Sequence, residues 1–185
     1  MKNISAGWRM AYISKSKSDS ADCVFCARPR GRSARKNLVI LEGEHAFIMM
    51  NRYPYTTGHL MVAPYRHVAG LARLRPEEAF EIARLVALSE VVLREAVRPD
   101  GLNVGVNVGR CAGAGCPGHV HVHVVPRWDG DTNFMPVVSE TKVLPETLTD
   151  TYRKIVKVVA RLSRRRRKAG RGGRVPWYLA GREER

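Results

Sequence analysis

The 185-residue sequence predicts an α+β fold: a five-stranded antiparallel sheet with one long helix and a C-terminal helix. The order of the predicted elements is three strands, a helix, two strands and a second helix. Strands that do not alternate one by one with helices favour an antiparallel sheet over a doubly wound parallel one. The apolar fraction of 44% is enough to build the core of one ordinary domain.

The first three strands are predicted from short apolar segments bounded by turn residues. The turn Glu42-Gly43-Glu44 joins the first two as a hairpin, and a polar loop precedes the third. The predicted strands are Leu38–Leu41, Ala46–Met50 and His59–Ala63.

The long helix is predicted to begin at Pro76, because proline suits the first helical turn. Apolar residues at helical spacing continue to Val97, and Pro99-Asp-Gly101 ends the pattern. Leu102–Val108 is the fourth predicted strand. A stripe of apolar residues predicts the second helix over Glu146–Leu162.

The charge distribution divides the chain into three parts. Residues 1–20 are a polar extension, 21–162 form the domain and 163–185 form a basic tail. The net charge is +15 and the pI is near 10.3. Such a tail is either a solvated segment or a nucleic-acid arm, and the remaining positive charge suits an anionic substrate. With no membrane-length apolar run and no signal-peptide pattern, we expect a cytoplasmic protein with no membrane partner.

Three histidines alternate with valines in His119-Val-His121-Val-His123. This alternation is typical of a strand, on which every second side chain points to the same face. Neighbouring rings are expected roughly 7 Å apart and the outer two about 13 Å apart. A single phosphorus atom cannot contact all three rings, so we expect the histidines to have different roles.

The pattern from His119 to Val125 resembles the signature of the histidine triad (HIT) family of nucleotide hydrolases and nucleotidyl transferases. The segments Asn51–His67 and Pro126–Met135 resemble the branch related to diadenosine tetraphosphate phosphorylases. The resemblance implies a HIT-like fold and a homodimer formed through the long helix and a shared sheet. It also implies that His121 attacks the α-phosphorus of a nucleotide, while His123 hydrogen-bonds the phosphate or orients the site.

Cys23 and Cys26 form a C-x-x-C pair, a spacing shared by metal sites and redox dithiols. The resemblance to zinc-bearing HIT proteins implies that His67 and His119 complete a structural Cys₂His₂ zinc site. Cys111 and Cys116 leave other arrangements open. They could join the C-x-x-C pair in a Cys₄ site, form a disulfide, or remain unliganded.

A glycine-rich loop, residues 109–118, precedes the triad, and its backbone N–H groups could approach an anion closely. The resemblance implies ribose binding by Asn51 and phosphate contacts around the loop, whereas His59 is interpreted as structural. Cys116 departs from the family pattern, which often has serine or threonine five residues before the nucleophile. The residues expected to contact the nucleotide are Asn51, Asn107, Gly113, Gly115, Cys116 and His123.

The leading functional hypothesis is an enzyme that cleaves diadenosine tetraphosphate through a nucleotidyl-histidine. Inorganic phosphate would be the second acceptor, giving ADP and ATP. The alternatives are a hydrolase of dinucleoside polyphosphates or nucleoside phosphoramidates, and a nucleic-acid-binding protein that removes adenylate from DNA ends. The basic tail favours the last alternative, but no recognisable second nucleic-acid domain supports it.

Overall fold

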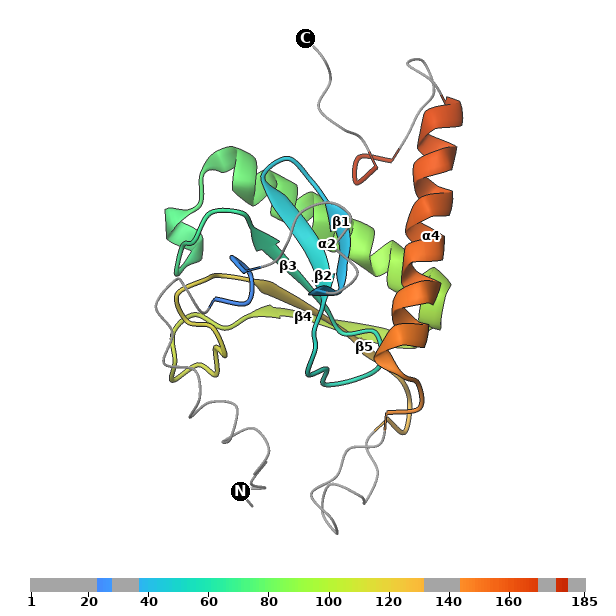
Figure 1. The fold of residues 1–185 in the computed structure, drawn as a ribbon, viewed down its shortest axis with the longest axis horizontal. Coiled ribbons are helices and arrows are strands. Elements are labelled where there is room, and N and C mark those ends of the chain that lie inside the picture. The colour runs from blue at the N-terminus through green and yellow to red at the C-terminus, as the bar shows by residue number, and fades with distance from the viewer. Residues whose placement is uncertain (1–22, 28–36, 132–143, 170–175, 180–185) are drawn as a thin grey trace.

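The computed structural model describes residues 23–27, 37–131, 144–169 and 176–179 (Figure 1). The predicted N-terminal extension and most of the predicted basic tail lie outside these residues. The strands are β1 (Val39–Glu42), β2 (Ala46–Met50), β3 (Leu60–Pro64), β4 (Gly101–Val106) and β5 (Val122–Arg127). They form one five-stranded antiparallel sheet, as the sequence predicts, and the structure shows the strand order to be β1-β2-β3-β5-β4.

The helices are α2 (Pro76–Val97) and α4 (Leu148–Ala169), and a short 3₁₀ helix, η3 (Leu71–Arg73), precedes α2. Figure 1 shows α2 across the sheet and α4 at one side of the molecule. No described helix is both long and apolar enough to cross a membrane.

Two clusters of buried side chains cover the two faces of the sheet. The larger lies between the sheet and both helices, and includes Met50, Leu60, Val124, Leu93 and Ile155. The smaller lies on the other face, where alternate residues of β2 and β3 meet the N-terminal C-x-x-C segment. Its members include Phe47, Met49, Met61, Cys23 and Phe25.

The bounds of β2 and α2 agree with the prediction, but α4 differs. It begins at Leu148 and continues to Ala169, seven residues beyond the predicted end at Leu162. Among the described side chains of α4, which end at Arg165, Leu162 is the last in the buried core, so core packing accounts for the helix only to that point. Arginine and lysine are good helix formers, and cations are favourable near a helix C-terminus, which explains why the helix continues.

The prediction that the whole triad lies on one strand is wrong. His119 and His121 precede β5, which begins at Val122, and only His123 lies on the strand. The cause is on the neighbouring strand: Pro64, which ends β3, has no N–H to donate, and its carbonyl accepts a hydrogen bond from the His119 ring. The ladder with β3 therefore ends at the pair Val62 and Val122.

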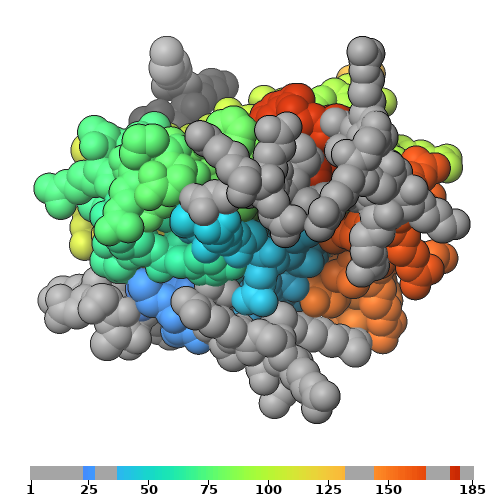
Figure 2. Space-filling view, turned by 90° about the horizontal axis from the view of Figure 1, so that it is seen from above, coloured from blue at the N-terminus to red at the C-terminus, as the bar shows by residue number. Residues whose placement is uncertain are grey.

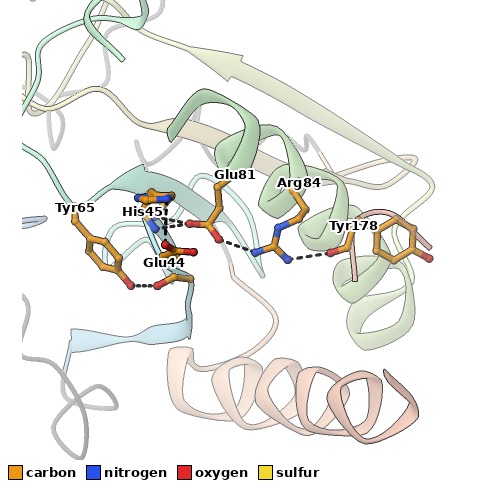
Figure 3. A network of polar contacts seen from close by, with 8 residues as sticks. Glu44, His45, Tyr65, Glu81, Arg84 and Tyr178 are labelled. Atoms are coloured by element: carbon orange, nitrogen blue, oxygen red, sulfur yellow. Dashed lines mark hydrogen bonds and ion pairs between the residues drawn. The ribbon is translucent and has the colours of Figure 1, made fainter. Parts of the chain in front are cut away.

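A buried carboxylate ties the β1–β2 turn to α2 and to the C-terminal turn 176–179 (Figure 3). Glu81 accepts hydrogen bonds from the backbone N–H groups of His45 and Ala46, and from Arg84 at 2.7 Å. Arg84 in turn donates to the carbonyl of Tyr178 at 3.3 Å. Three segments far apart in the sequence are thus held by one acidic side chain.

Candidate active site and metal site

His121, the predicted nucleophile, is 4% exposed and is held in one tautomer. Its Nδ1 lies 2.8 Å from the carbonyl oxygen of His119. A carbonyl only accepts, so Nδ1 must carry the proton and Nε2 keeps a free lone pair. Burial lowers the pKa of His121 below its ordinary value, although the hydrogen bond to His119 opposes the shift. The ring is therefore neutral near pH 7, as a nucleophile requires.

The ring of Phe25, from the C-x-x-C segment, packs at a tilt against this candidate nucleophile. Its ring centroid lies 4.6 Å from that of His121 and 5.0 Å from that of His119. Phe25 is itself 3% exposed. The segment that carries Cys23 and Cys26 therefore also covers the candidate nucleophile.

His123 is oriented by a fourth histidine, His59, which is fully buried. The backbone N–H of Tyr55 donates to His59 Nδ1 at 3.2 Å, so the His59 proton lies on Nε2. That nitrogen is 2.9 Å from Nδ1 of His123 and donates to it. The Nε2 atom of His123 consequently carries a proton and can donate it to a substrate oxygen.

A cavity of about 390 Å³ opens beside His123 on the β4 side of the sheet. Arg127 crosses its edge, held by Asp131 at 2.6 and 2.8 Å and by Asn103 at 2.9 Å. The ion pair with Asp131 raises the pKa of Arg127. The lining residues are Tyr55, Thr56, Asn103, Val104, Gly105, Asn107, His123, Val125, Arg127 and Asp131.

The other residues predicted to bind the nucleotide do not all line the cavity beside His123. Asn51 contacts His59 Nδ1 at 3.3 Å and accepts from the Tyr53 N–H. Asn107 lines the cavity and contacts the carbonyl of Gly113, which has a φ of 89°. Gly115 follows in the same loop. Nucleotide contacts by these residues remain predictions.

Cys116 contacts the metal-ligand cluster, because its sulfur lies 3.5 Å from Sγ of Cys23, and its contact with a nucleotide remains a prediction. The Cys116 thiol hydrogen-bonds Cys23 and holds the pKa of that cysteine well below its ordinary value. The same contact, together with burial, raises the pKa of Cys116. The two shifts favour the thiolate form of Cys23, which is the form that binds metals, and the thiol form of Cys116.

The four predicted metal ligands converge. One ligating atom from each of Cys23, Cys26, His67 and His119 lies within 4.8 Å of all the others. The sulfur-to-Nδ1 distances are 3.3 to 3.5 Å. A tetrahedral zinc with ordinary bond lengths places its nitrogen and sulfur ligand atoms about 3.3–3.8 Å apart. The residues therefore fit a closed metal site, whereas Cys111 is exposed and lies outside the cluster.

Two further contacts shape this cluster. The Nε2 atom of His119 donates to the Pro64 carbonyl at 2.9 Å, which leaves Nδ1 unprotonated and facing the cysteines. A Cβ atom at Gly118 would lie 2.9 Å from Nε2 of His67, so a side chain there would displace this histidine. The first contact favours ligation through Nδ1 of His119, and the second shows that His67 occupies the space left by the missing side chain of Gly118.

Sequence reasoning missed the roles of His59 and Phe25. His59 was interpreted as structural, yet it contacts His123 directly. Strand alternation held a usable signal: Met61 pairs with His123, and His59 lies two residues earlier on the same face. Phe25 carried no comparable signal, because its contact with His121 joins segments far apart in the chain.

Comparisons with known proteins agree with this geometry. The family model described as HIT domain matches residues 32–130, more than half of the chain. An AP-4-A phosphorylase from Mycobacterium tuberculosis is 39% identical over 152 residues, covering 79% of this chain and 78% of that protein. An uncharacterized 16.1 kDa HIT-like protein from Mycoplasma pneumoniae is 30% identical, covering 70% and 88%.

Solved structures show the same fold. A Zn-bound histidine triad family protein from Mycobacterium smegmatis superimposes with a TM-score of 0.61 and 26% identity, covering 80% of this chain and 99% of that one. A hypothetical histidine triad nucleotide-binding protein from Sulfolobus tokodaii gives a TM-score of 0.62 and 25% identity, covering 83% and 100%. Sequence, fold and the arrangement of the three histidines together show that the chain belongs to the HIT family.

Proposed function

We propose that the protein is an enzyme that cleaves dinucleoside polyphosphates, with diadenosine tetraphosphate as its leading substrate, through a nucleotidyl intermediate on His121. One observation carries the proposal: two adjacent imidazoles are fixed in complementary tautomers. Nε2 of His121 holds a lone pair, and Nε2 of His123 holds a proton. Their ring centroids are 4.7 Å apart, close enough to act on one phosphoryl group.

In the first step, Nε2 of His121 attacks the α-phosphorus, and a P–N bond forms as the bond to the bridging oxygen breaks. ATP leaves with the electron pair of that bond, and the Nε2 proton of His123 neutralises charge on the departing oxygen. In the second step, an oxygen of inorganic phosphate attacks the same phosphorus and the P–N bond breaks. The adenylyl group becomes ADP, and His121 is regenerated.

The choice of phosphate as second acceptor rests on the similarity to the AP-4-A phosphorylase of M. tuberculosis. The cavity supports a nucleotide substrate, because it opens beside His123; the charge of Arg127 in its lining is balanced by the ion pair with Asp131.

We propose zinc as the metal of the Cys₂His₂ cluster. The two thiolates and two imidazoles are the donor set that zinc prefers, and the similar M. smegmatis structure is Zn-bound. A closed four-ligand zinc supplies no reactive position, so its role is to hold residues 23–27 against the sheet.

The proposal is tested by incubating purified protein with diadenosine tetraphosphate, with and without phosphate, and resolving the products chromatographically. We expect ADP and ATP in equal amounts only when phosphate is present. AMP and ATP without any phosphate dependence would identify a hydrolase instead. Two further arms, adenosine 5′-phosphoramidate and a 5′-adenylated DNA oligonucleotide, test the alternative substrates. Faster turnover of either one would overturn the substrate assignment.

We also propose a homodimer that uses the free edge of the sheet. β4 is the last strand in the order, and Val104 on it is 54% exposed. A second copy would cover this apolar side chain and satisfy the outer edge of β4. Sedimentation should show a dimer for the native chain and a monomer for Val104→Lys. A native monomer at micromolar concentration would contradict the proposal.

A further inference from the structure

The outward face of α4 carries a continuous strip of positive charge that the proposed enzymatic function does not use. Residues 153–169 contain nine basic residues and no acidic one. Within the described side chains, the exposed basic residues are Arg153, Lys154, Lys157, Arg161, Arg164 and Arg165. In Figure 2 α4, drawn in orange, forms one side of the molecule.

The charge of the strip is only partly neutralised. Arg153 pairs with Asp150 and Lys154 with Glu146, both at the N-terminal end of the helix. Farther along, Arg161 pairs with Glu95 of α2. Among the described residues, Lys157, Arg164 and Arg165 have no acidic partner. The unneutralised charge thus extends from the middle of α4 toward its C-terminal end.

Neither the fold nor the helix dipole requires this arrangement. Lys157, Arg161 and Arg165 follow one another at a spacing of four residues, where like charges repel. The dipole stabilises cations only in the last turn, which excludes Lys157 and Arg161. Repulsion between these like charges therefore destabilises the helix locally. Binding of a polyanion would offset that destabilisation.

The strip is also separate from the active site. Both helices contribute to the larger core on one face of the sheet, whereas Phe47, Met61 and Phe25 gather on the other face beside the triad. The residues that line the cavity beside His123 come from β4, β5 and nearby loops, not from α4. Charge on α4 therefore cannot contact a nucleotide bound at His121.

We propose that the outward face of α4 is a nucleic-acid-binding surface that contacts the phosphate backbone without reading sequence. Lys157 and Arg165 are eight residues apart, about 12 Å along the helix axis. Duplex DNA presents one negative charge per roughly 1.7 Å of its own axis, so several phosphates can face the strip at once.

The packing of α4 favours nucleic acid over a membrane surface. Ile155, Val159 and Leu162 are buried in the core, so the apolar side of the helix is unavailable for insertion between lipids. The outward side offers charge alone, which matches a phosphate backbone.

The test compares two variants that each lose three exposed positive charges. One carries Lys157→Gln, Arg164→Gln and Arg165→Gln on α4. The matched control carries Arg73→Gln, Arg94→Gln and Arg98→Gln, which are exposed and lie outside α4. Fluorescence anisotropy measures binding of a labelled DNA duplex and a single-stranded RNA at several salt concentrations. We expect the α4 variant to reduce the slope of log K against log salt by about 2–3 and to weaken binding at least about tenfold, with the control near wild type.

Several outcomes would overturn the assignment. The first is that wild type binds no nucleic acid at about 50 mM salt. The second is that both variants lose nucleic-acid affinity equally. The third is tighter binding to anionic vesicles or poly-glutamate than to nucleic acid. Turnover of a small nucleotide is measured in parallel and should be unchanged in both variants. Because the binding assay contains no nucleotide substrate, its result is independent of the proposed enzymatic function.

Discussion

At the scale of single residues, the nucleophile gives the sharpest prediction. His121→Asn removes the attacking lone pair but keeps part of the hydrogen-bonding capacity at Nδ1. We expect turnover to fall by at least about three orders of magnitude with nucleotide binding largely kept, the pattern for an interaction made only in the transition state. Mass spectrometry of the wild-type enzyme should find an acid-labile nucleotidyl adduct on the peptide that contains His121.

His45→Asn is the control, because this histidine lies in the β1–β2 turn and should leave turnover unchanged. An adduct on His123, or a tenth of wild-type turnover in His121→Asn, would show that the nucleophile is assigned wrongly.

His59 is predicted to act through His123. His59→Leu removes the donor to Nδ1 of His123, so the proton of that ring is no longer fixed on Nε2. We expect kcat to fall about tenfold or more with little change in KM. His59→Gln, whose amide can still donate, should recover part of the loss. Nitrogen NMR of His123 reports the tautomer directly, and an unchanged tautomer in His59→Leu would refute this role.

The candidate residues could be selected from the sequence, but their protonation could not. Alternation and the C-x-x-C spacing selected the three histidines and the cysteine pair, and the resemblance to the HIT family gave His121 and His123 their predicted roles. The tautomers depend on partners from other segments, such as the Tyr55 N–H and the Pro64 carbonyl. The contact between Cys116 and Cys23 could not be predicted for a similar reason: it joins two segments far apart in the chain, and only packing directs the sulfur toward Cys23.

At the scale of elements, the β1–β2 turn depends on the absence of a side chain. A Cβ atom at Gly43 would lie 2.6 Å from Oε1 of Glu81 and 2.7 Å from the carbonyl of Ala46. Gly43→Ala should therefore displace the buried carboxylate and cost about 1–3 kcal/mol of unfolding free energy. Gly101→Ala is the matched control, because no atom lies within 4 Å of its added methyl group. Equal losses in chemical denaturation would contradict the explanation.

The junction between η3 and α2 should be sensitive to acid. Glu78 accepts hydrogen bonds from Arg66 at 2.7 and 2.9 Å and from the Arg75 N–H at 2.8 Å. Arg66 is the main cause that lowers the pKa of Glu78 to about 2. A depressed carboxyl pKa contributes stability above the unfolded pKa of about 4.3 and loses it as the pH falls toward 2.

Melting temperatures of wild type and Glu78→Gln should accordingly differ by a constant amount above about pH 5 and converge as the pH approaches the folded pKa. A gap that persists at pH 2 would mean that the ionised carboxylate is not what stabilises this junction.

The end of a helix or strand could be predicted where residues at that end determine it. Pro76 and the Pro99-Asp-Gly101 sequence set the ends of α2, and both ends match the structure. The start of β5 was not predictable, because it is set by Pro64 on a neighbouring strand. The end of α4 was missed because an apolar stripe marks only the packed part of a helix.

At the scale of the whole molecule, the metal site should control stability. Residues 23–27 contact the sheet through Cys23 and Phe25, and a bound metal would tie them to His67 and His119. We expect about one zinc per purified chain, and Cys23→Ser should lower metal content and melting temperature together, since metal binding is coupled to folding.

Elemental analysis and thermal melts of wild type, Cys23→Ser and Cys111→Ser decide the matter. Cys111→Ser should resemble wild type, because Cys111 is exposed and outside the cluster. Loss of zinc in that variant, or a fully stable metal-free wild type, would contradict the assignment.

Both ring nitrogens of His119 are already engaged, one facing the cysteines and one bound to Pro64. We therefore expect the three histidines to vary in two groups. Across homologues, His119 should be retained or lost together with the cysteine pair, while His121 and His123 should follow catalytic activity. In a saturation mutagenesis screen, changes at His119 should reduce protein abundance as changes at Cys23 do. Changes at His121 should leave abundance high and abolish function.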